Sequence, residues 1–344
     1  MAEADDYFER LVDVDKLRAF LAAEVGSTDT YDVQRHEGGN SNETLTVEWG
    51  ERTFIVRRPP PGETADTAHD VLREYRVMSA LQDTDVPVPE TIVGCDDHEI
   101  IGSDFYVMER VPGDVPRASV PDRFQTTGGR QQVGEALVDT LAKINQVDVE
   151  AVGLEEFGYP EGYTERQVDR WHEQLEWAFE VTREEREVAA LDRVGEWLAD
   201  NTPTDYPHTL VHGDYKHDNV MFAPDTPPRL NAVLDWEMST LGDPFFDLGW
   251  MLSYWRDPKD PEPVLPELVT RFMEHEDFPT RRELVDPTLF DEDEDAHGGH
   301  GRDDGGHGGE DHSHPHGGEE AGHRHDGHHH GQSRVDGRNP PEDT

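Results

Sequence analysis

The sequence predicts an α+β fold with a small β-rich N-terminal part followed by a larger, mainly helical C-terminal part. Three observations predict it. Apolar residues alternate along 45–56, as in strands, and then follow helical spacing over 68–81. Beyond Gly113 the helical spacing dominates, and only two short apolar runs remain, at 209–211 and 230–234. A chain of 344 residues is long enough to bury a core in each part.

The N-terminal elements follow from this spacing. Leu45, Val47 and Trp49 alternate before a Gly-Glu turn, which is typical of a β-hairpin. The expected elements are a helix near 14–21, hairpin strands at 45–49 and 54–56, a helix at 68–81, and strands at 91–94 and 105–111.

The C-terminal elements are mostly helices. They are expected at about 130–146, 165–187, 188–200, 245–255 and 263–275, with the two short strands between them. The ranges of these expected elements predict an N-lobe at residues 1–111, a C-lobe at 112–290 and a tail at 291–344.

The tail differs from the rest of the chain in composition. Residues 291–344 contain 15 acidic residues, 11 His and 13 Gly but no aromatic residue. Such a segment buries too little apolar surface to offset its ordering entropy, so we expect disorder. Its imidazole clusters could bind divalent metals adventitiously, although their spacing matches no closed structural site.

Charge excludes several classes of function. The 77 acidic and 30 basic residues give a net charge of −47, which repels nucleic acids and anionic membrane surfaces.

The chain has no long apolar run and no signal peptide pattern, and Cys95 is its single cysteine, so we expect a cytoplasmic location. An acidic excess with only four lysines indicates adaptation to molar salt. An acidic disordered protein is the alternative, and the apolar periodicity of 1–290 argues against it.

The strongest motif lies between the two short apolar runs. His212, Asp214 and Asn219 form H-x-D-x-x-x-x-N, and Asp235 follows 16 residues after Asn219. Phosphoryl transfer from ATP needs a carboxylate to accept the proton of the acceptor hydroxyl, and oxygen ligands for Mg²⁺. These residues supply both requirements. The alternative is that they only make turns, but the ordered pair of motifs favours a kinase.

Four segments carry a resemblance to a known family: GGNSNETLTV, RRPPPG, AHDVLREYRVM and HGDYKHDN. Over about residues 12–285 the chain resembles the aminoglycoside phosphotransferase and choline kinase group, which shares the two-lobed fold of protein kinases. It is most similar to the kinase domains joined to acyl-CoA dehydrogenases. The resemblance implies that Asp214 is the catalytic base and that Asn219 and Asp235 bind Mg²⁺. It also implies that His212 braces the loop and that Asp247 hydrogen-bonds it from the next helix.

The resemblance also assigns nucleotide contacts in the N-lobe. The loop over the ATP phosphates would be made by Gly38, Gly39, Asn40, Ser41 and Asn42, although such loops are often plain turns. Glu109 to Val111 would offer backbone groups to the adenine edge. Arg57 takes the usual lysine position with Glu74 as its partner, and Arg58 is the competitor. The alternative is that both arginines are ordinary exposed strand residues.

Acceptor-side residues are less specific. Lys216 could neutralise the transferring phosphoryl group, or it could be a solvated lysine. The resemblance puts one helical stretch beside the acceptor pocket, with Trp171, Gln174, Glu176 and Trp177. Aromatic core packing is the favoured explanation for that stretch. Glu237 could face the substrate or support the metal ligands.

The sequence therefore predicts an ATP- and Mg²⁺-dependent kinase acting on a small-molecule hydroxyl acceptor. The branch suggests a hydroxyacyl-CoA, with aminoglycosides and then choline-like molecules as alternatives. HGD and DWE, rather than HRD and DFG, disfavour a protein kinase. The resemblance implies further aromatic-bearing helices past 280–286, so the C-lobe is expected to be truncated. The tail is expected to replace these helices through a frameshift, a gene-model error or a degenerating gene. A nucleotide-binding but inactive protein and a metal-binding protein acting through the tail are the other hypotheses.

Overall fold

The computed structural model describes most of the chain before the tail. The described residues are 2–36, 42–62, 70–182, 189–263 and 269–286, without side chains for 2–6 and 189. They all belong to the first of two units into which the chain divides, residues 1–293. The predictions of disorder and metal binding for 291–344 concern residues outside this description.

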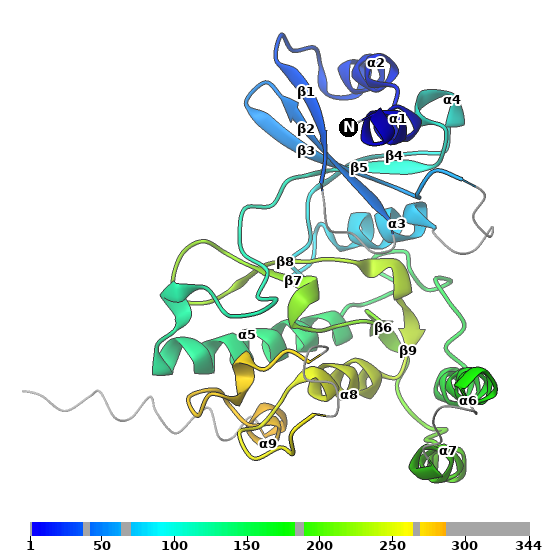
Figure 1. The fold of residues 1–344 in the computed structure, drawn as a ribbon, viewed down its shortest axis with the longest axis vertical. Coiled ribbons are helices and arrows are strands. Elements are labelled where there is room, and N and C mark those ends of the chain that lie inside the picture. Colours follow the sequence, from blue (N-terminus) through cyan, green and yellow to red (C-terminus); the bar gives the residue numbers. More distant parts are fainter. Residues whose placement is uncertain (1, 37–41, 63–69, 183–188, 264–268, 287–344) are drawn as a thin grey trace, which may run out of the picture. The chain divides into compact units, whose positions relative to one another are not determined.

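The N-lobe is built on a five-stranded antiparallel sheet in the order β1-β2-β3-β5-β4 (Figure 1). The strands are β1 (Tyr31–Arg35), β2 (Glu43–Trp49), β3 (Arg52–Arg58), β4 (Thr91–Cys95) and β5 (Phe105–Glu109). The predicted hairpin is confirmed, since Leu45 pairs with Val56 and Val47 with Phe54, all four buried. Strand β1 was not expected from the sequence, and β5 ends two residues before its expected end.

Helices cover both faces of this sheet. They are α1 (Ala2–Leu11), α2 (Val14–Val25), α3 (Val71–Leu81) and α4 (His98–Ile101). The N-terminal helices share a core with the sheet through Leu11, Leu17 and Leu21. Helix α3 packs against β4 and β5, and it contacts the C-lobe near Trp236 (Figure 1). The sequence did not predict α1, which is rich in acidic residues.

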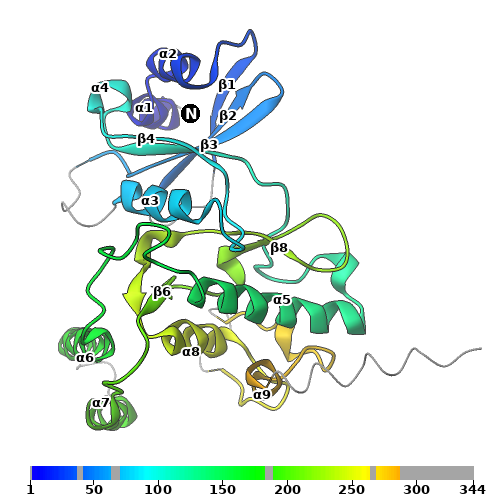
Figure 2. The ribbon, with the colours of Figure 1, turned by 180° about the vertical axis from the view of Figure 1, so that it is seen from behind.

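The C-lobe places short strands over a helical core. Its strand pairs are β6 (Thr209–Val211) with β9 (Thr240–Gly242), and β7 (Val220–Phe222) with β8 (Leu230–Val233). Its helices are α5 (Thr127–Asn145), α6 (Tyr163–Thr182), α7 (Ala189–Asn201), α8 (Pro244–Tyr254) and α9 (Arg281–Val285). Helix α5 contacts β6, β8, α8 and α9, so it forms the centre of this lobe (Figure 2).

The helix expected at 263–275 is not supported by the described part of that range. Residues 264–268 lie outside the description, and over 269–275 the chain forms only a 3₁₀ turn, Phe272–Glu274. Pro261, Pro263 and Pro266 precede this turn, and proline cannot donate a helical hydrogen bond. Side-chain packing holds the turn, since Met273 is buried and Phe272 and Phe278 are in ring contact.

The chain passes from the N-lobe to the C-lobe directly after β5. Asp114 already pairs with Phe222 of β7, through N–H···O distances of 3.0 and 2.9 Å. Gly113 has φ +154°, and a Cβ there would lie 2.3 Å from the Phe222 carbonyl oxygen. Only glycine allows this close approach of backbones. The short connection therefore brings the end of β5 next to β7, the strand that follows the H-x-D motif.

Candidate active site

The 212–219 loop connects β6 to β7, and hydrogen bonds to Asp247 of α8 hold it in place. The Asp247 carboxylate accepts the backbone N–H groups of His212, at 2.6 Å, and Gly213, at 2.8 Å. Gly213 has φ +84°, and a Cβ there would lie 2.4 Å from the Met238 carbonyl oxygen. Burial raises the pKa of Asp247, while His212 and the two N–H donors oppose that rise. The expected hydrogen bonds between the loop and Asp247 are thus present, with the loop N–H groups as donors.

His212 links this loop to the segment that carries Asp235. Its imidazole is fully buried, and its Nδ1 accepts the Asp214 N–H at 3.2 Å. Its Nε2 therefore carries the proton and donates to the Leu234 carbonyl at 2.9 Å. The imidazole fixes both ends of the site, which agrees with the bracing position expected from the sequence.

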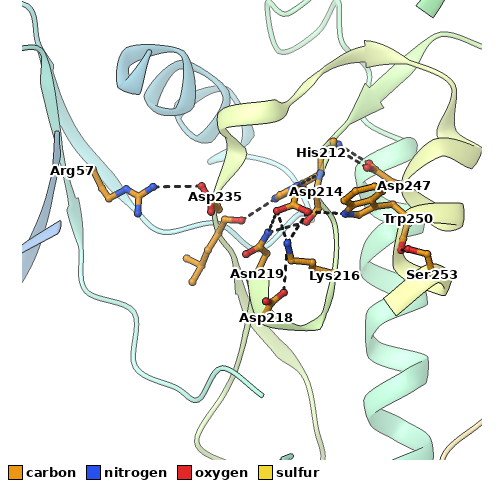
Figure 3. Close-up of polar contacts among 12 residues, drawn as sticks. Arg57, His212, Asp214, Lys216, Asp218, Asn219, Asp235, Asp247, Trp250 and Ser253 are labelled. Atoms are coloured by element: carbon orange, nitrogen blue, oxygen red, sulfur yellow. Dashed lines mark hydrogen bonds and ion pairs between the residues drawn. The ribbon is translucent and has the colours of Figure 1, made fainter. Parts of the chain in front are cut away.

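Four hydrogen bonds converge on the Asp214 carboxylate (Figure 3). Lys216 Nζ lies 2.8 Å from both oxygens. Asn219 Nδ2 donates to Oδ2 at 2.8 Å, and Trp250 Nε1 donates to Oδ1 at 2.7 Å. An ionised carboxylate offers about four lone-pair directions, so these donors fill them all. The carboxylate is fixed in orientation and cannot rotate without losing a charge-assisted bond.

Trp250 was missed by the sequence reasoning. It lies on α8 three residues after Asp247, so both side chains face the loop from one side of the helix. This spacing is the signal that could have located it. Its ring also stacks on Trp171 of α6 at 6.2 Å and on Phe246 at 6.2 Å.

Lys216 points at Asp214 rather than into solvent. Its ammonium lies 5.1 Å from the centre of the Tyr254 ring and 4.0 Å from Asp218. Burial alone would lower the pKa of Lys216, but the Asp214 carboxylate outweighs burial and raises it. The ammonium therefore stays charged, and the solvated-lysine alternative does not describe it.

Asn219 lies directly before β7 and Asp235 lies two residues after β8, so both are at the same end of one hairpin. The Leu234 N–H donates to the Asn219 carbonyl at 2.8 Å, which brings the two candidate metal ligands together. Asp235 has φ 68°, a left-handed conformation that is unusual for aspartate and that turns its side chain out of the strand direction. Amide and carboxylate oxygens are the ligands that Mg²⁺ prefers, so this pair fits the ion.

The geometry distinguishes Arg57 from Arg58. Arg57 reaches the buried Glu74 at 3.6 Å. It also reaches Asp235 at 3.4 Å (Figure 3). Burial would lower the pKa of Arg57, but Glu74 and Asp235 raise it, so the guanidinium is charged. Arg58 is buried on the other face, where it donates to the Leu11 carbonyl and to that of Ile101 at 2.8 Å. Neither arginine is an ordinary exposed strand residue, and only Arg57 faces the site.

Only some of the N-lobe residues that were expected to contact the nucleotide lie within the described part of the chain. Gly38, Gly39, Asn40 and Ser41 lie outside the described residues. Asn42 is buried and donates to Glu237 Oε2 at 3.3 Å, so Glu237 contacts the end of that loop. The Glu109 N–H donates to the Glu90 carbonyl at 2.8 Å, and its side chain pairs with Arg52. A nucleotide could therefore use the carbonyl of Glu109 but not its N–H, and Val111 follows directly after the sheet.

The expectation of core packing for the α6 tryptophans is wrong. Trp171 is 46% exposed and Trp177 is 66% exposed. Helices α6 and α7, called here the helix pair, pack on each other and border an apolar groove of about 620 Å³. Its walls include Val168, Trp171, Leu175, Trp177, Leu191 and Val194, and Gln174 lies among them. Glu176 instead pairs with His172 at 3.4 Å. Amphipathic spacing shows that a helix has an apolar face, but not whether another element covers it.

Comparison with known proteins decides the family. Residues 32–284 match the model of the phosphotransferase enzyme family. The chain belongs to this family. The match spans both lobes, so this phosphotransferase carries its candidate site within the matched region.

Its relatives include much longer proteins. Human acyl-CoA dehydrogenase family member 11 is 33% identical over 258 residues, which cover 74% of this chain and 32% of the relative. Mouse acyl-CoA dehydrogenase family member 10 is 36% identical, covering 70% of this chain and 22% of the relative. The phosphotransferase thus spans about a third or less of these relatives. The predicted similarity to kinase domains joined to acyl-CoA dehydrogenases is confirmed.

Solved structures confirm the kinase-like fold. A protein from Ralstonia eutropha that is provisionally assigned as an aminoglycoside phosphotransferase is 32% identical, with a TM-score of 0.64 and 81% of each chain covered. The GDP complex of aminoglycoside 2′-phosphotransferase-IIIa has a TM-score of 0.54 at 16% identity, covering 70% of this chain and 78% of that one. None of the described helices combines the length and apolar character needed to span a lipid bilayer.

Proposed function

We propose that this phosphotransferase moves the γ-phosphoryl group of ATP to a hydroxyl group of a small molecule, with Mg²⁺ held by Asn219 and Asp235. One observation carries the proposal: four donors fix the Asp214 carboxylate directly beside these oxygen ligands. Such preorganisation suits phosphoryl transfer, in which positioning and electrostatics supply most of the rate enhancement. Solved structures of the fold with bound GDP support nucleotide use.

The residues near the nucleotide have different roles, which follow from where they lie. When bound, Mg²⁺ neutralises charge on the phosphates. Arg57 contributes a second, fixed positive charge, because Glu74 holds its guanidinium on the site side of β3. Asn42 would contact the phosphates together with the loop before it. The carbonyl of Glu109 and the N–H of Val111 would meet the adenine edge.

Asp214 acts on the acceptor. Its carboxylate orients the acceptor hydroxyl and takes the proton as that oxygen attacks the γ-phosphorus. The bond from the γ-phosphorus to the bridging oxygen of ADP breaks as the new bond forms, and ADP leaves. The proton then passes from Asp214 to solvent. His212 and Asp247 keep the loop fixed during this step, since both hold its backbone.

Lys216 must release one carboxylate oxygen before a hydroxyl can bind. All four lone-pair directions of Asp214 are filled, and Lys216 alone contacts both oxygens. The transferring phosphoryl group offers the ammonium an alternative anionic partner nearby. We therefore assign to Lys216 a movement from Asp214 to the phosphoryl group as substrates bind.

The apolar groove favours an acyl acceptor. Trp171 forms one wall of the groove and stacks on Trp250, which donates to Asp214. A hydroxyl at Asp214 would therefore belong to a molecule whose apolar chain continues toward the helix pair. The names of the relatives point the same way, so we propose a hydroxyacyl-CoA. Aminoglycosides remain the alternative, but these polycations would meet mostly apolar walls.

Calorimetric titration of MgATP in molar KCl tests the nucleotide part of the proposal. We expect magnesium-dependent binding that Asp235→Ala loses and Asp214→Ala keeps. Transfer to hydroxyacyl-CoAs is then assayed, and Asp214→Ala is expected to reduce it by about a thousandfold. Asp218→Ala, in the same loop, is the control. Equal turnover by wild type and Asp214→Ala would overturn the mechanism, and a folded protein without MgATP binding would indicate an inactive family member.

A further inference from the structure

Helix α3 reaches the C-lobe through Arg73, whose position no catalytic role explains. The Arg73 guanidinium donates to the Ser239 carbonyl at 2.9 Å and to the Phe157 carbonyl at 3.1 Å. Its plane also covers the Phe157 ring, with 3.9 Å from Cζ to the ring centre. Arginine suits such a contact because its flat fork donates in fixed directions while it stacks on an aromatic face.

The two accepting carbonyls belong to segments that are packed tightly against each other. Phe157 and Ser239 are buried, and a Cβ on Gly158 would lie 2.2 Å from Thr240 Oγ1. The receiving surface is therefore rigid. Burial lowers the pKa of Arg73, but only from the very high ordinary value of arginine, so the group stays charged and its bonds are charge-assisted.

Ser239 ends the segment that begins with Asp235. Glu74, the neighbour of Arg73 on α3, is buried and pairs with Arg57, which in turn pairs with Asp235. Helix α3 is thus joined to both ends of the 235–239 segment. Arg73 bonds directly to Ser239, and Glu74 is linked to Asp235 through Arg57. The first contact does not use a charged partner in the C-lobe, so molar salt screens it little.

We infer that Arg73 is a positioning residue that sets where Asp235 stands relative to Arg57, and so governs the magnesium-dependent part of ATP affinity. This inference rests on the proposed function, because it takes Asp235 to be a metal ligand. Without Arg73, α3 and the 235–239 segment keep their packing around Trp236 and the Arg57 ion pairs, but they lose the bond that fixes Ser239 at the end of the segment. Asp235 is then held less firmly, while Arg57 stays anchored on β3.

The experiment measures ATP dissociation constants with and without Mg²⁺, by calorimetry in molar KCl, for wild type and Arg73→Met. We expect the affinity gain from Mg²⁺ to fall by about tenfold, as for a lost bond to a charged group. Binding of ATP in EDTA should change less than about twofold. Arg76→Met is the matched control, since Arg76 lies one turn along α3, exposed, with its Cζ 5.8 Å from the same ring. It should behave as wild type.

The outcomes separate this inference from the proposed function. A wild-type protein without magnesium-dependent binding overturns both. Wild-type binding together with an unchanged magnesium gain in Arg73→Met overturns the inference alone. A variant that loses affinity equally with and without Mg²⁺ also overturns it, because that result indicates general loosening of the lobes. If Arg73→Met does not fold, Arg73→Lys replaces it. Lysine keeps the charge but lacks the fork, so an intermediate loss is expected, and full magnesium dependence would overturn the inference.

Discussion

Trp250 contacts two regions that differ in burial: the 212–219 loop is mostly buried and hydrogen-bonded, whereas the helix pair is largely exposed. Its indole N–H bonds to Asp214 in the 212–219 loop, and its ring stacks on Trp171 in the helix pair. In the loop, His212 is fully buried and donates or accepts at both ring nitrogens. In the helix pair, Trp177 and Trp197 are 66% and 61% exposed. Substitutions in the loop should therefore affect catalysis and stability strongly, whereas those in the helix pair should affect only what binds there.

The largest effect on stability is expected at the support of the loop. Asp247→Ala leaves the buried N–H groups of His212 and Gly213 without their acceptor. Each such group costs about 1–3 kcal/mol, so we expect the free energy of unfolding to fall by about 2–4 kcal/mol. Urea unfolding in molar KCl measures it. Asp243→Ala is the control, because that side chain accepts one N–H at the start of α8 and should cost about 1 kcal/mol. Equal losses in the two variants would contradict the special rigidity of the loop.

Trp250→Phe tests the link between the two regions. Phenylalanine keeps an aromatic ring against Trp171 but removes the N–H donated to Asp214 at 2.7 Å. We expect kcat for phosphoryl transfer to fall by about tenfold, because a hydrogen bond to a charged group is lost, while the dissociation constant of MgATP stays unchanged. Trp171→Phe changes the same stack from the other side and should alter kcat less than about threefold. A weaker effect for Trp250→Phe than for Trp171→Phe would show that stacking matters rather than the hydrogen bond.

His217 gives the loop a pH dependence of its own. It is buried against Phe272, and burial lowers its pKa below the ordinary 6.5. Above pH 6.5 both the folded and the unfolded state carry the neutral ring. As the pH falls below 6.5 the unfolded state gains a proton that the folded state resists, so stability declines by up to about 1.4 kcal/mol per pH unit.

The His217→Leu variant isolates this contribution. Many carboxylates titrate in the same range, so the quantity to measure is the difference in unfolding free energy between wild type and variant, from pH 7.5 downward. We expect the variant to lose less stability as the pH falls, with the difference fully developed once the folded histidine is protonated. Lys216 and Asp218 flank the ring and are present in both proteins. Parallel pH profiles would show that His217 is protonated equally in both states.

The two regions also differ in how well the sequence predicts them. The motif located His212, Asp214 and Asn219 because they lie a few residues apart in the chain, and Asn219 donates to Asp214 within the loop. The hydrogen bonds that Asp247 accepts from the loop, over 34 and 35 residues, were expected only from the family resemblance. Other contacts between distant elements were not predicted. Trp250 reaches Asp214 over 36 residues, and Arg73 reaches Ser239 over 166.

The helix pair shows a second limit of prediction from sequence, which concerns burial. Its helices were predicted, but the favoured burial of Trp171 was wrong, because apolar spacing does not reveal whether a neighbour exists. The Arg57 and Arg58 pair was resolved only by strand pleating, which sends successive side chains to opposite faces of β3.

The smallest effect on stability is expected at Trp177. Its side chain is 66% exposed, so Trp177→Gln should change the free energy of unfolding by less than about 0.5 kcal/mol. It also lines the apolar groove, and there the substitution removes wall area that an acyl chain would cover. We expect KM to rise for long-chain hydroxyacyl-CoAs and to stay constant for short-chain ones, with kcat unchanged. Steady-state kinetics across a chain-length series measures both.

Trp49→Gln provides the contrast that makes the Trp177 result interpretable. Trp49 is buried in the N-lobe sheet, donates its indole N–H to the Gly26 carbonyl at 3.0 Å, and lies far from the groove in sequence. Its replacement should destabilise the protein by about 3 kcal/mol without altering chain-length preference. If Trp177→Gln were equally destabilising, the helix pair would be a structural support like the sheet. If Trp177→Gln changed neither stability nor chain-length preference, the acyl chain would have to bind elsewhere, and the contrast between a rigid loop and an acceptor-binding helix pair would fail.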